Sequence, residues 1–175
     1  MTAAMGVILD QSSNTQKFFG GGQVDMKAKN VSDDTLCHTD DVTAINISLD
    51  RKLMVSGQVG SAPAVFVWDS ETGAKKQRFK LAKGARGIDC IAISADGSKV
   101  ACVDRSDTHN VYLFDVSSGA GLGVEKGDNN KIFDCNFAPI PGNNSFVTVG
   151  AKHIKFWDAS NLAGKKSGVF GSAGE

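Results

Sequence analysis

Several features that mark other protein classes are missing from this sequence of 175 residues. Lysine plus arginine and aspartate plus glutamate number 19 each, so the formal net charge at pH 7 is zero. No overall field therefore indicates a nucleic-acid or membrane partner, and we expect neither. Proline is scarce, at three residues, and no apolar stretch approaches the length of a membrane span.

Signals for secretion and for disulfide bonding are also lacking. The stretch MTAAMGVILDQSS at the amino terminus has no basic segment and too short an apolar run for a signal peptide. The four cysteines form no C-x-x-C pair, and Cys90, Cys102 and Cys135 fall inside apolar runs. These features predict buried free thiols in a protein of the cytoplasm or cytoskeleton.

Motifs for catalysis and cofactor binding are absent as well. His38, His109 and His153 have no metal-ligand spacing, and no G-x-S-x-G, H-E-x-x-H or Walker sequence occurs. The Gly-rich stretch 119–127 departs from G-x-G-x-x-G at Val124 and opens no helix, which does not fit a phosphate-binding loop. We therefore expect no catalytic residue, no metal site, no cofactor and no enzymatic activity.

What the sequence does contain is a repeat of about 45 residues. Each copy has a short apolar run, a turn and a second apolar run, in segments 42–58, 88–104 and 132–151. A third run follows in each copy, at 64–68, 110–114 and 153–157. A fourth, more polar run is clearest in KKQRFKL at 75–81.

The runs have the character of strands. They are five to seven residues long, rich in Val, Ile and Phe, and separated by turns. Some, such as VFVW and VYLF, are apolar on both faces, which is typical of a sheet that is covered on both sides. Four short strands every 40 to 45 residues predict an all-β fold, a propeller with about three and a half four-stranded blades.

The repeat divides the chain into five segments. Residues 1–19 resemble the outer strands of a preceding blade, because GVILD and TQKFF match a third and a fourth run. Residues 20–37 form a Gly-led polar insertion loop, which either orders on a partner or, as we favour, stays disordered. Three blades follow, at 38–83, 84–127 and 128–175.

Each third run ends in an aromatic residue followed by aspartate. The pairs are Trp68-Asp69, Phe114-Asp115 and Trp157-Asp158. In each case a polar turn with a glycine follows, so the carboxylate can accept bonds from turn amides and the glycine can adopt a positive φ. We predict that the aromatic rings fill the space between neighbouring blades and that all these residues are structural.

The runs that end in Trp68-Asp69 and Trp157-Asp158 resemble WD repeats. GVILDQSSNTQKFF, HTDDVTAINIS, AVFVWDSETG and FVTVGAKHIKFWD together resemble the amino-terminal propeller of the echinoderm microtubule-associated protein-like family. The resemblance covers nearly the whole chain except 20–37. It implies association with tubulin or microtubules and with other cytoskeletal or axonemal proteins. Because a propeller closes with at least about four blades, we expect a portion of a longer protein whose remaining blades close the ring.

The hydrogen-bond network of WD repeats is incomplete in every copy. Such repeats usually join a histidine after glycine, a Ser or Thr, the tryptophan, and an aspartate before the third strand. Here His38 does not follow glycine, while Ser56 and Trp68 stand at the expected places. The second copy has Phe114 and no histidine, and the third has Trp157 without the histidine. We therefore do not assume that the network stabilises any copy.

One local feature is a candidate for partner binding. The basic segment KKQRFKLAKGAR has six cations and no acid: Lys75, Lys76, Arg78, Lys80, Lys83 and Arg86. The strand period places Lys76, Arg78 and Lys80 on one face, which we expect to meet solvent on an outermost strand. These cations either keep foreign strands from pairing there or form a basic stripe for an acidic surface such as that of tubulin.

The sequence therefore favours a non-enzymatic protein that binds microtubules or tubulin through a WD-repeat propeller, in the spindle or in a ciliary axoneme. The alternative is a generic WD-repeat scaffold or adaptor in another multiprotein complex, because a propeller fold does not by itself fix a function.

Overall fold

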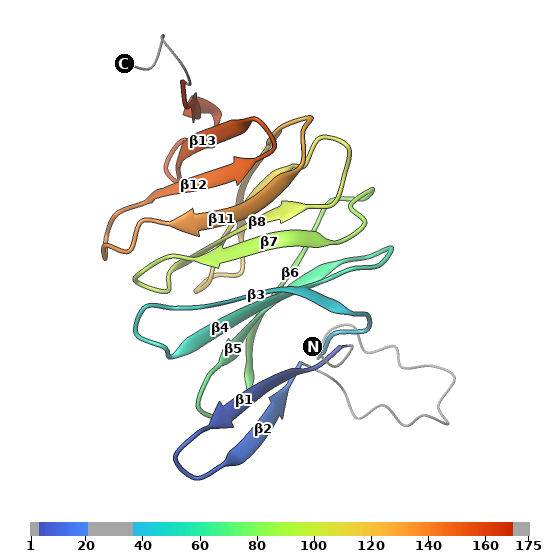
Figure 1. Ribbon diagram of the computed structural model, residues 1–175, viewed down its shortest axis with the longest axis vertical. Helices are drawn as coiled ribbons and strands as arrows, with labels where there is room; N and C mark the ends of the chain where they lie inside the picture. The colour runs from blue at the N-terminus through green and yellow to red at the C-terminus, as the bar shows by residue number, and fades with distance from the viewer. Residues whose placement is uncertain (1–3, 21–36, 170–175) are drawn as a thin grey trace.

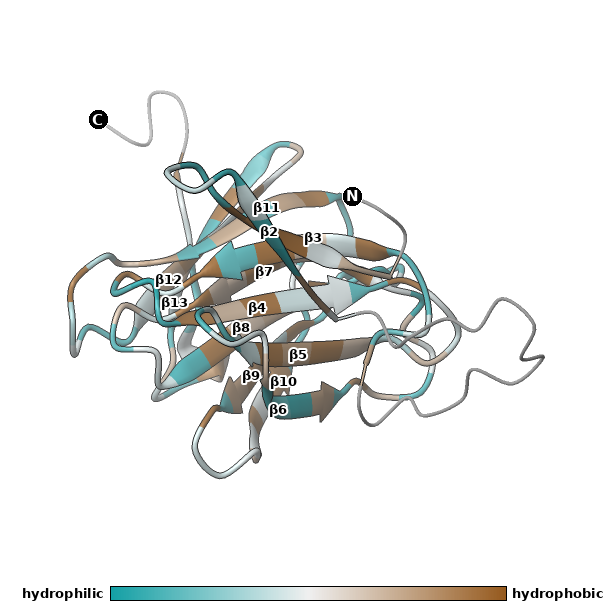
Figure 2. Ribbon diagram, turned by 90° about the horizontal axis from the view of Figure 1, so that it is seen from below, coloured by the Kyte–Doolittle hydropathy of each residue, from teal (hydrophilic) through white to brown (hydrophobic). Residues whose placement is uncertain are grey.

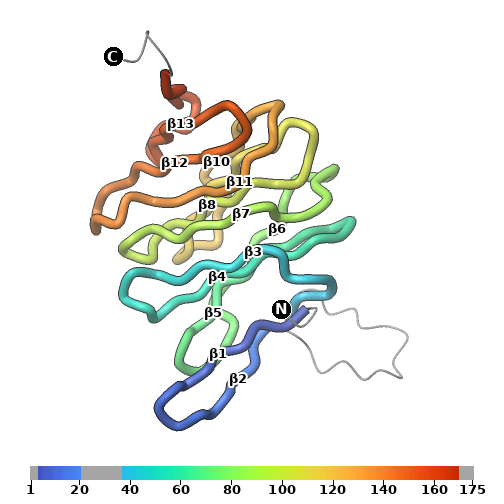
Figure 3. Tube along the Cα trace, in the orientation of Figure 1, coloured from blue at the N-terminus to red at the C-terminus, as the bar shows by residue number. Residues whose placement is uncertain are grey.

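The computed structural model describes residues 4–20 and 37–169, and these residues form four antiparallel sheets (Figure 1). The sheets follow one another in chain order from one end of the molecule to the other, as the tube in Figure 3 shows. The two ends of the stack do not meet. This arrangement confirms the prediction of an all-β fold whose four-stranded blades make up part of a propeller.

The strands fall into a half blade and three blades. The half blade contains β1 (Gly6–Asp10) and β2 (Thr15–Phe19). The first blade contains β3 (Val42–Ile47), β4 (Leu53–Gln58), β5 (Ala64–Asp69) and β6 (Lys75–Lys80). The second blade contains β7 (Ile88–Ile93), β8 (Lys99–Asp104), β9 (Val111–Asp115) and β10 (Gly121–Glu125). The third blade contains β11 (Ile132–Phe137), β12 (Ser145–Gly150), β13 (His153–Asp158) and β14 (Lys166–Ser167).

The exact segment boundaries expected from the sequence stay predictions. Residues 21–36, which hold most of the predicted insertion loop at 20–37, lie outside the described residues. No helix among the described residues is both long enough and apolar enough to cross a membrane.

The turns between third and fourth strands follow from the residues that the repeat places there. In the first blade, Asp69 accepts hydrogen bonds from the amide of Thr72 at 2.9 Å, and Gly73 adopts a φ of 73°. In the second blade, Asp115 accepts one from the amide of Ser118 at 2.8 Å, and Gly119 has a φ of 75°. Glycine adopts this left-handed conformation at low cost, so the chain can reverse there. In the third blade, a short 3-10 helix, η1 (Leu162–Gly164), follows the turn instead.

Apolar side chains fill the space between consecutive sheets in three clusters. The half blade and the first blade share Phe19, Met54, Ala64, Phe66 and Trp68. The first and second blades meet through a cluster that includes Val55, Val65, Phe79, Ile88, Val100 and Phe114. The second and third blades meet through Val103, Leu113, Cys135, Phe146 and Trp157, among others. β5, β8 and β9 are buried on both faces, which explains why their sequences are almost continuously apolar.

Polar contacts and close backbone approach also join the first two blades. The Thr43 hydroxyl donates to the Ile88 carbonyl at 2.7 Å, and Val59 forms a backbone bridge with Gly87. A side chain at position 57 would place its Cβ 2.7 Å from atoms of Ile88, so Gly57 permits this contact. The blades therefore pack as one stack with a defined register between neighbours.

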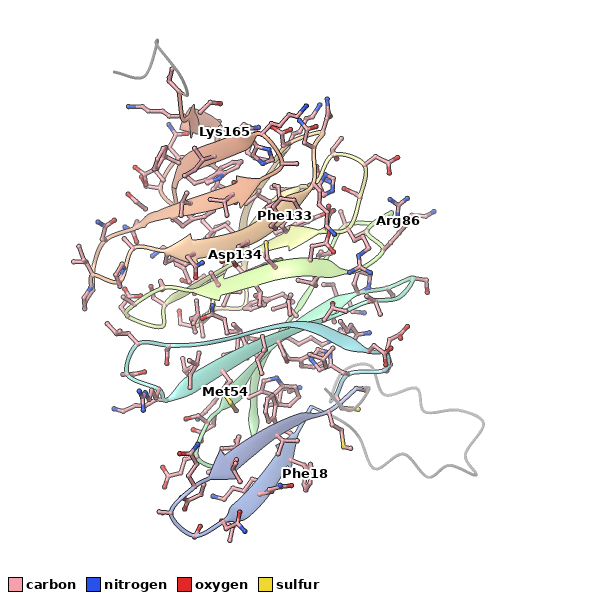
Figure 4. All side chains as sticks on the ribbon, in the orientation of Figure 1. Phe18, Met54, Arg86, Phe133, Asp134 and Lys165 are labelled. Atoms are coloured by element: carbon pink, nitrogen blue, oxygen red, sulfur yellow. The ribbon has the colours of Figure 1, made fainter. Side chains whose placement is uncertain are left out.

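The two end sheets of the stack expose apolar side chains. On the third blade, Phe133 and Phe156 are 60% and 52% exposed. At the other end, Phe18 on β2 of the half blade is 58% exposed, and Leu9 on β1 is 49% exposed. Figure 4 shows Phe18 and Phe133 on different sheets of the stack. Exposed apolar surface of this extent is typical of a sheet that packs against another element.

Candidate functional site

The first blade contains a buried polar network around its tryptophan. The indole N–H of Trp68 donates to the Ser56 hydroxyl oxygen at 2.7 Å. His38 Nε2 lies 2.7 Å from the same oxygen, and His38 Nδ1 lies 2.8 Å from the amide oxygen Oε1 of Gln58. Since that oxygen can only accept, Nδ1 carries the proton, and Nε2 accepts from Ser56. The sequence placed Ser56 and Trp68 at the expected positions, but because His38 follows Cys37 rather than glycine it did not predict that this network forms.

Gln58 is the member of this network that sequence reasoning missed. Its amide oxygen contacts His38, in a network where the WD pattern given above has an aspartate. Its side-chain N–H donates to the Thr39 hydroxyl at 3.1 Å. The only signal in the sequence is its place as the last residue of the second run. Burial lowers the pKa of His38 to about 4, although the Gln58 hydrogen bond acts in the opposite direction, so the ring is neutral at pH 7.

The second blade replaces this network with an aspartate and a tyrosine. Asp104 is 1% exposed and ends β8 at the position that Gln58 takes in β4. It accepts hydrogen bonds from the amide of Asn110 at 2.8 Å and from the hydroxyl of Tyr112 at 3.0 Å. Burial and the Asp104 charge raise the pKa of Tyr112 to about 12. Cys102, which pairs with Tyr112 across the strands, stands where Ser56 stands in the first blade.

The third blade keeps the tryptophan contact and adds an ion pair. The Trp157 indole N–H donates to the Thr148 hydroxyl at 2.9 Å. The ammonium of Lys155, whose side chain is 14% exposed, lies 2.8 Å from the carboxylate of Asp128. Burial raises the pKa of Asp128, but the hydrogen bonds from Lys155 and Asn130 outweigh it and hold that pKa well below its usual range.

His153 is placed beside the ion pair of the third blade. Its Nδ1 atom lies 3.1 Å from the Ala151 carbonyl and 3.7 Å from the Asp128 carboxylate. A side chain at position 150 would overlap the imidazole ring, so Gly150 leaves room for it. His109 approaches from the second blade, with Nδ1 3.1 Å from the Asp128 carbonyl. The three histidines therefore serve separate polar contacts between strands and loops.

The aromatic residues before each aspartate lie against the preceding sheet. Trp68 lies 5.7 Å from Phe19 of the half blade, centroid to centroid. Phe114 stacks on Phe79 of the first blade at 4.5 Å, with an interplanar angle of 11°. Trp157 is 2% exposed and belongs to the cluster between the second and third blades. All three positions are core positions.

The aspartates after these rings hold the turns. Hydrogen bonds from Thr72 lower the pKa of Asp69 to about 2, and hydrogen bonds from Ser117 and Ser118 lower the pKa of Asp115 to about 2. The hydroxyl and amide of Ser160 lower the pKa of Asp158. A carboxylate engaged by its own turn in this way is ionised at neutral pH and has a structural role.

The basic segment is divided among several environments. Lys76 pairs with Asp69 at 3.2 Å, and Arg86 pairs with Asp107 at 2.8 Å (Figure 4 labels Arg86 on its loop). The Arg78 guanidinium lies 5.9 Å above the Phe66 ring and is only partly exposed, so this residue does not extend into solvent as the strand period predicted. The cause is the open outer face of Phe66, which the planar guanidinium covers.

Lys75, Lys80 and Lys83 are exposed. Lys75 and Lys80 lie at the two ends of β6, and Lys83 follows in the loop to the second blade. In Figure 2, β6 is largely teal and the neighbouring β5 largely brown, so polar surface begins at the outermost strand. Together with Lys76 and Arg86, which are also exposed, these three lysines form a surface that a partner can reach.

No arrangement for metal binding occurs in the described part of the chain: residues 4–20 and 37–169 hold no group of three or more His, Cys, Asp or Glu that could bind an ion.

Hollows of about 510 and 260 Å³ lie on the third blade. The larger is lined by Val149, Gly150, Lys152, His153 and Ile154. The smaller is lined mainly by apolar side chains, including Phe137, Phe146 and Phe156.

Comparison with known proteins identifies relatives, although no family model matches the sequence. The chain is 42% identical over 175 residues to the ciliary WD repeat-containing protein ctxp80 of Euplotoides octocarinatus, which covers 99% of this chain. It is 32% identical over 152 residues to echinoderm microtubule-associated protein-like 3 of Mus musculus, and 31% identical over 144 residues to echinoderm microtubule-associated protein-like 1 of Rattus norvegicus. These two matches cover 77% and 76% of this chain.

The relatives are much longer than this chain, which spans 24% of ctxp80 and 17% and 18% of the other two proteins. Among solved structures, the WD40 repeats of RRP9 superpose with a TM-score of 0.64 at 20% identity, over 77% of this chain and 40% of that chain. At this identity the likeness shows the fold alone, and that fold is the WD-repeat propeller. Together with the sequence matches, it shows that the chain belongs to the WD-repeat proteins of the echinoderm microtubule-associated protein-like family.

Proposed function

We propose that this chain is part of a non-enzymatic WD-repeat protein of the microtubule cytoskeleton that binds tubulin or microtubules, in a cilium or a spindle. The observation that carries the proposal is the identity of 42% over nearly the whole chain with a protein named as ciliary, beside identities of 31–32% with proteins named as microtubule-associated. The described side chains support binding rather than catalysis, because their buried polar groups hold strands and turns together.

The exposed lysines of the basic segment are the proposed contact with tubulin. Lys75, Lys80 and Lys83 lie on the outer strand of the first blade and on the loop that follows it. Acidic surfaces attract such cations, and the attraction is screened by salt over about a Debye length, near 8 Å at physiological ionic strength. Binding through this surface is therefore sensitive to salt.

The proposal includes further blades of the same protein. The apolar end faces described above fit the covering that neighbouring blades give to β5, β8 and β9. Further blades would present the basic segment on a closed, rigid ring. They are also the source of any additional contact with cytoskeletal or axonemal proteins.

Co-sedimentation with microtubules tests the proposal. In the full-length protein, the triple variant Lys75→Glu, Lys80→Glu, Lys83→Glu is expected to bind roughly tenfold more weakly than the parent, because three attractive charges become repulsive. The matched control is Lys131→Glu, Lys152→Glu, Lys166→Glu, which makes the same charge change at exposed lysines of the third blade. The control should bind like the parent protein.

Two outcomes would redirect the proposal. Equal loss of binding in both triple variants would show a response to net charge and remove the basic segment from the contact. A parent protein that does not sediment with microtubules, and that captures a different multiprotein complex from the cell, would identify a general WD-repeat scaffold or adaptor instead.

A further inference from the structure

The first strands of the three blades share one position at which the third blade carries a charge. Ala44, Cys90 and Asp134 each form the first pair after the register shift between the first and second strands of their blade. Ala44 is 8% exposed and Cys90 is 5% exposed, and each belongs to the apolar cluster shared with the following blade. Asp134 is exposed, and Figure 4 labels it on β11 with Phe133.

Asp134 lies on the face of the third blade that no described sheet covers. Cys135, the next residue of β11, is 1% exposed and belongs to the cluster shared with the second blade. Successive strand residues point to opposite faces, so Asp134 points away from the second blade. By the same alternation Phe156, which precedes the buried Trp157, lies on the open face, where it is 52% exposed.

The carboxylate of Asp134 has hydrogen bonds but no opposite charge beside it. It accepts from the backbone amide of Cys135 at 2.9 Å and from the side-chain amide of Asn136 at 2.7 Å. Both donors are neutral, and no ion pair engages Asp134 within residues 4–20 and 37–169. A sheet that packed here would remove water from this charge, which is costly unless the sheet brings a partner for it.

The contact between the second and third blades shows which strand would supply that partner. Cys90 stands at the position of Asp134, and the thiol of Cys135 hydrogen-bonds to it. Cys135 lies on β11, the first strand of the following blade. A blade that followed the third blade in the same way would therefore place its own first strand against Asp134.

We propose that the open face of the third blade is covered by a further blade of the same protein, whose first strand presents a lysine or arginine to the carboxylate of Asp134. This inference rests on the proposed function, which includes further blades, and adds the chemistry of their contact. The described blades follow one another in chain order, and the chain spans only 24% of ctxp80, so a relative has sequence for more of them. The ion pair compensates the charge that packing buries and favours this blade over an apolar sheet.

Maleimide labelling of the variant Phe156→Cys in the full-length protein is the test. Labelling requires the covering sheet to move away, so its rate follows the stability of the contact. With a cation opposite, adding Asp134→Ala leaves that cation buried without a partner, and labelling at position 156 should become about tenfold faster or more. Without a cation, the same change removes an unpaired buried carboxylate, and labelling should become slower.

Two further variants separate charge from size and from position. Asp134→Asn keeps the size of the side chain and removes its charge, so it should also speed labelling. The matched control is Asp40→Ala in the loop before the first blade. Asp40 is exposed, and its carboxylate likewise accepts from the following backbone amide, at 2.8 Å. This control should leave labelling at position 156 unchanged.

Three results would overturn the proposal. One is labelling that is slower or unchanged when Asp134→Ala is added. Another is labelling of the Phe156→Cys protein that speeds up on dilution, which would make a second copy the cover of this face. The third is fast labelling of the Phe156→Cys protein before any change at Asp134, and this result alone would also remove the further blades from the proposed function. No tubulin is present, so the outcome is independent of the microtubule experiment.

Discussion

The first and third blades share one buried hydrogen bond but surround it with different side chains. In both, a tryptophan of the third strand donates to a hydroxyl of the second strand, at 2.7 Å for Trp68 and 2.9 Å for Trp157. Around this shared contact, the first blade uses the neutral His38 and Gln58, whereas the third blade uses a charged pair between Asp128 and Lys155. The fold therefore fixes the position of the contact, while its surroundings vary with the local sequence.

The difference is clearest at one register position. Phe66 in β5 and Lys155 in β13 each lie opposite the hydroxyl residue of the neighbouring strand. Phe66 is fully buried and packs against His38 and Trp68, with ring centroids 4.7 and 5.1 Å apart. The ammonium of Lys155 instead pairs with the carboxylate of Asp128. We therefore expect the stability of the first blade to depend mainly on side-chain volume and on pH, and the stability of the third blade to depend mainly on charge.

The largest expected effect is the loss of volume in the first blade. Phe66→Ala removes a fully buried ring and should destabilise the protein by about 3–5 kcal/mol. Urea unfolding followed by tryptophan fluorescence measures this change. Phe66→Leu keeps most of the volume and should cost clearly less. A cost for Phe66→Ala below about 1 kcal/mol would contradict close packing around His38 and Trp68.

A smaller effect is expected from pH, again in the first blade. The pKa of His38 is about 4 in the folded protein against 6.5 for an ordinary histidine. Between about pH 6.5 and pH 4, His38 is therefore protonated in the unfolded chain and neutral in the folded chain. As a result, the stability of the folded protein falls as the pH drops through this range. Between pH 7 and pH 5 this loss amounts to about 2 kcal/mol.

Urea unfolding at several pH values separates the His38 contribution from others. His38→Gln should be less stable than the parent at pH 7 but should lose less stability on acidification. The aspartates in the turns act at lower pH, since a pKa near 2 for Asp69 and Asp115 gives stability that is lost below about pH 4. If His38→Gln and the parent lost the same stability between pH 7 and pH 5, the neutral buried network would be wrong.

The smallest expected effect concerns the ion pair of the third blade. Lys155→Met keeps most of the length of the side chain and removes its charge, which leaves Asp128 with hydrogen bonds from Asn130. Because the pair is partly exposed to water, we expect a loss of only about 1 kcal/mol. The loss should shrink in high salt. The matched double variant Asp128→Asn, Lys155→Met, measured in a double-mutant cycle, reports the coupling of the pair directly.

The sequence predicts the strands well because their signals are local. Each copy contains short apolar runs, turn glycines and an aromatic residue followed by aspartate. The strands assigned in one copy therefore support the assignment in the others. The positions of Ser56 and Trp68 could be read in the same way, since Thr148 and Trp157 recur at these places in the third copy, whereas His38 has no counterpart in the other copies. The structure then supplies the distances that join them.

The partners that sequence analysis missed lie far apart in the chain. Asp128 and Lys155 are separated by a whole strand pair, and the fold alone brings their charged groups together. The place of Gln58 at the end of the second run was too weak a signal, because glutamine at the end of a strand is ordinary. Arg78 was misjudged because strand alternation gives the face of a side chain but not the ring that lies beneath it. Contacts between residues of different strands can be identified only from the packed structure.

The central claim is that the described sheets are consecutive blades of a larger propeller, whose end faces other blades cover. The most direct test is the rate at which a maleimide labels the variant Phe156→Cys, located by mass spectrometry, in the full-length protein and in the 1–175 chain. The native cysteines 37, 90, 102 and 135 are buried and should react slowly in both. We predict slow labelling at position 156 in the full-length protein and fast labelling in the 1–175 chain. Equally fast labelling in both would contradict the account.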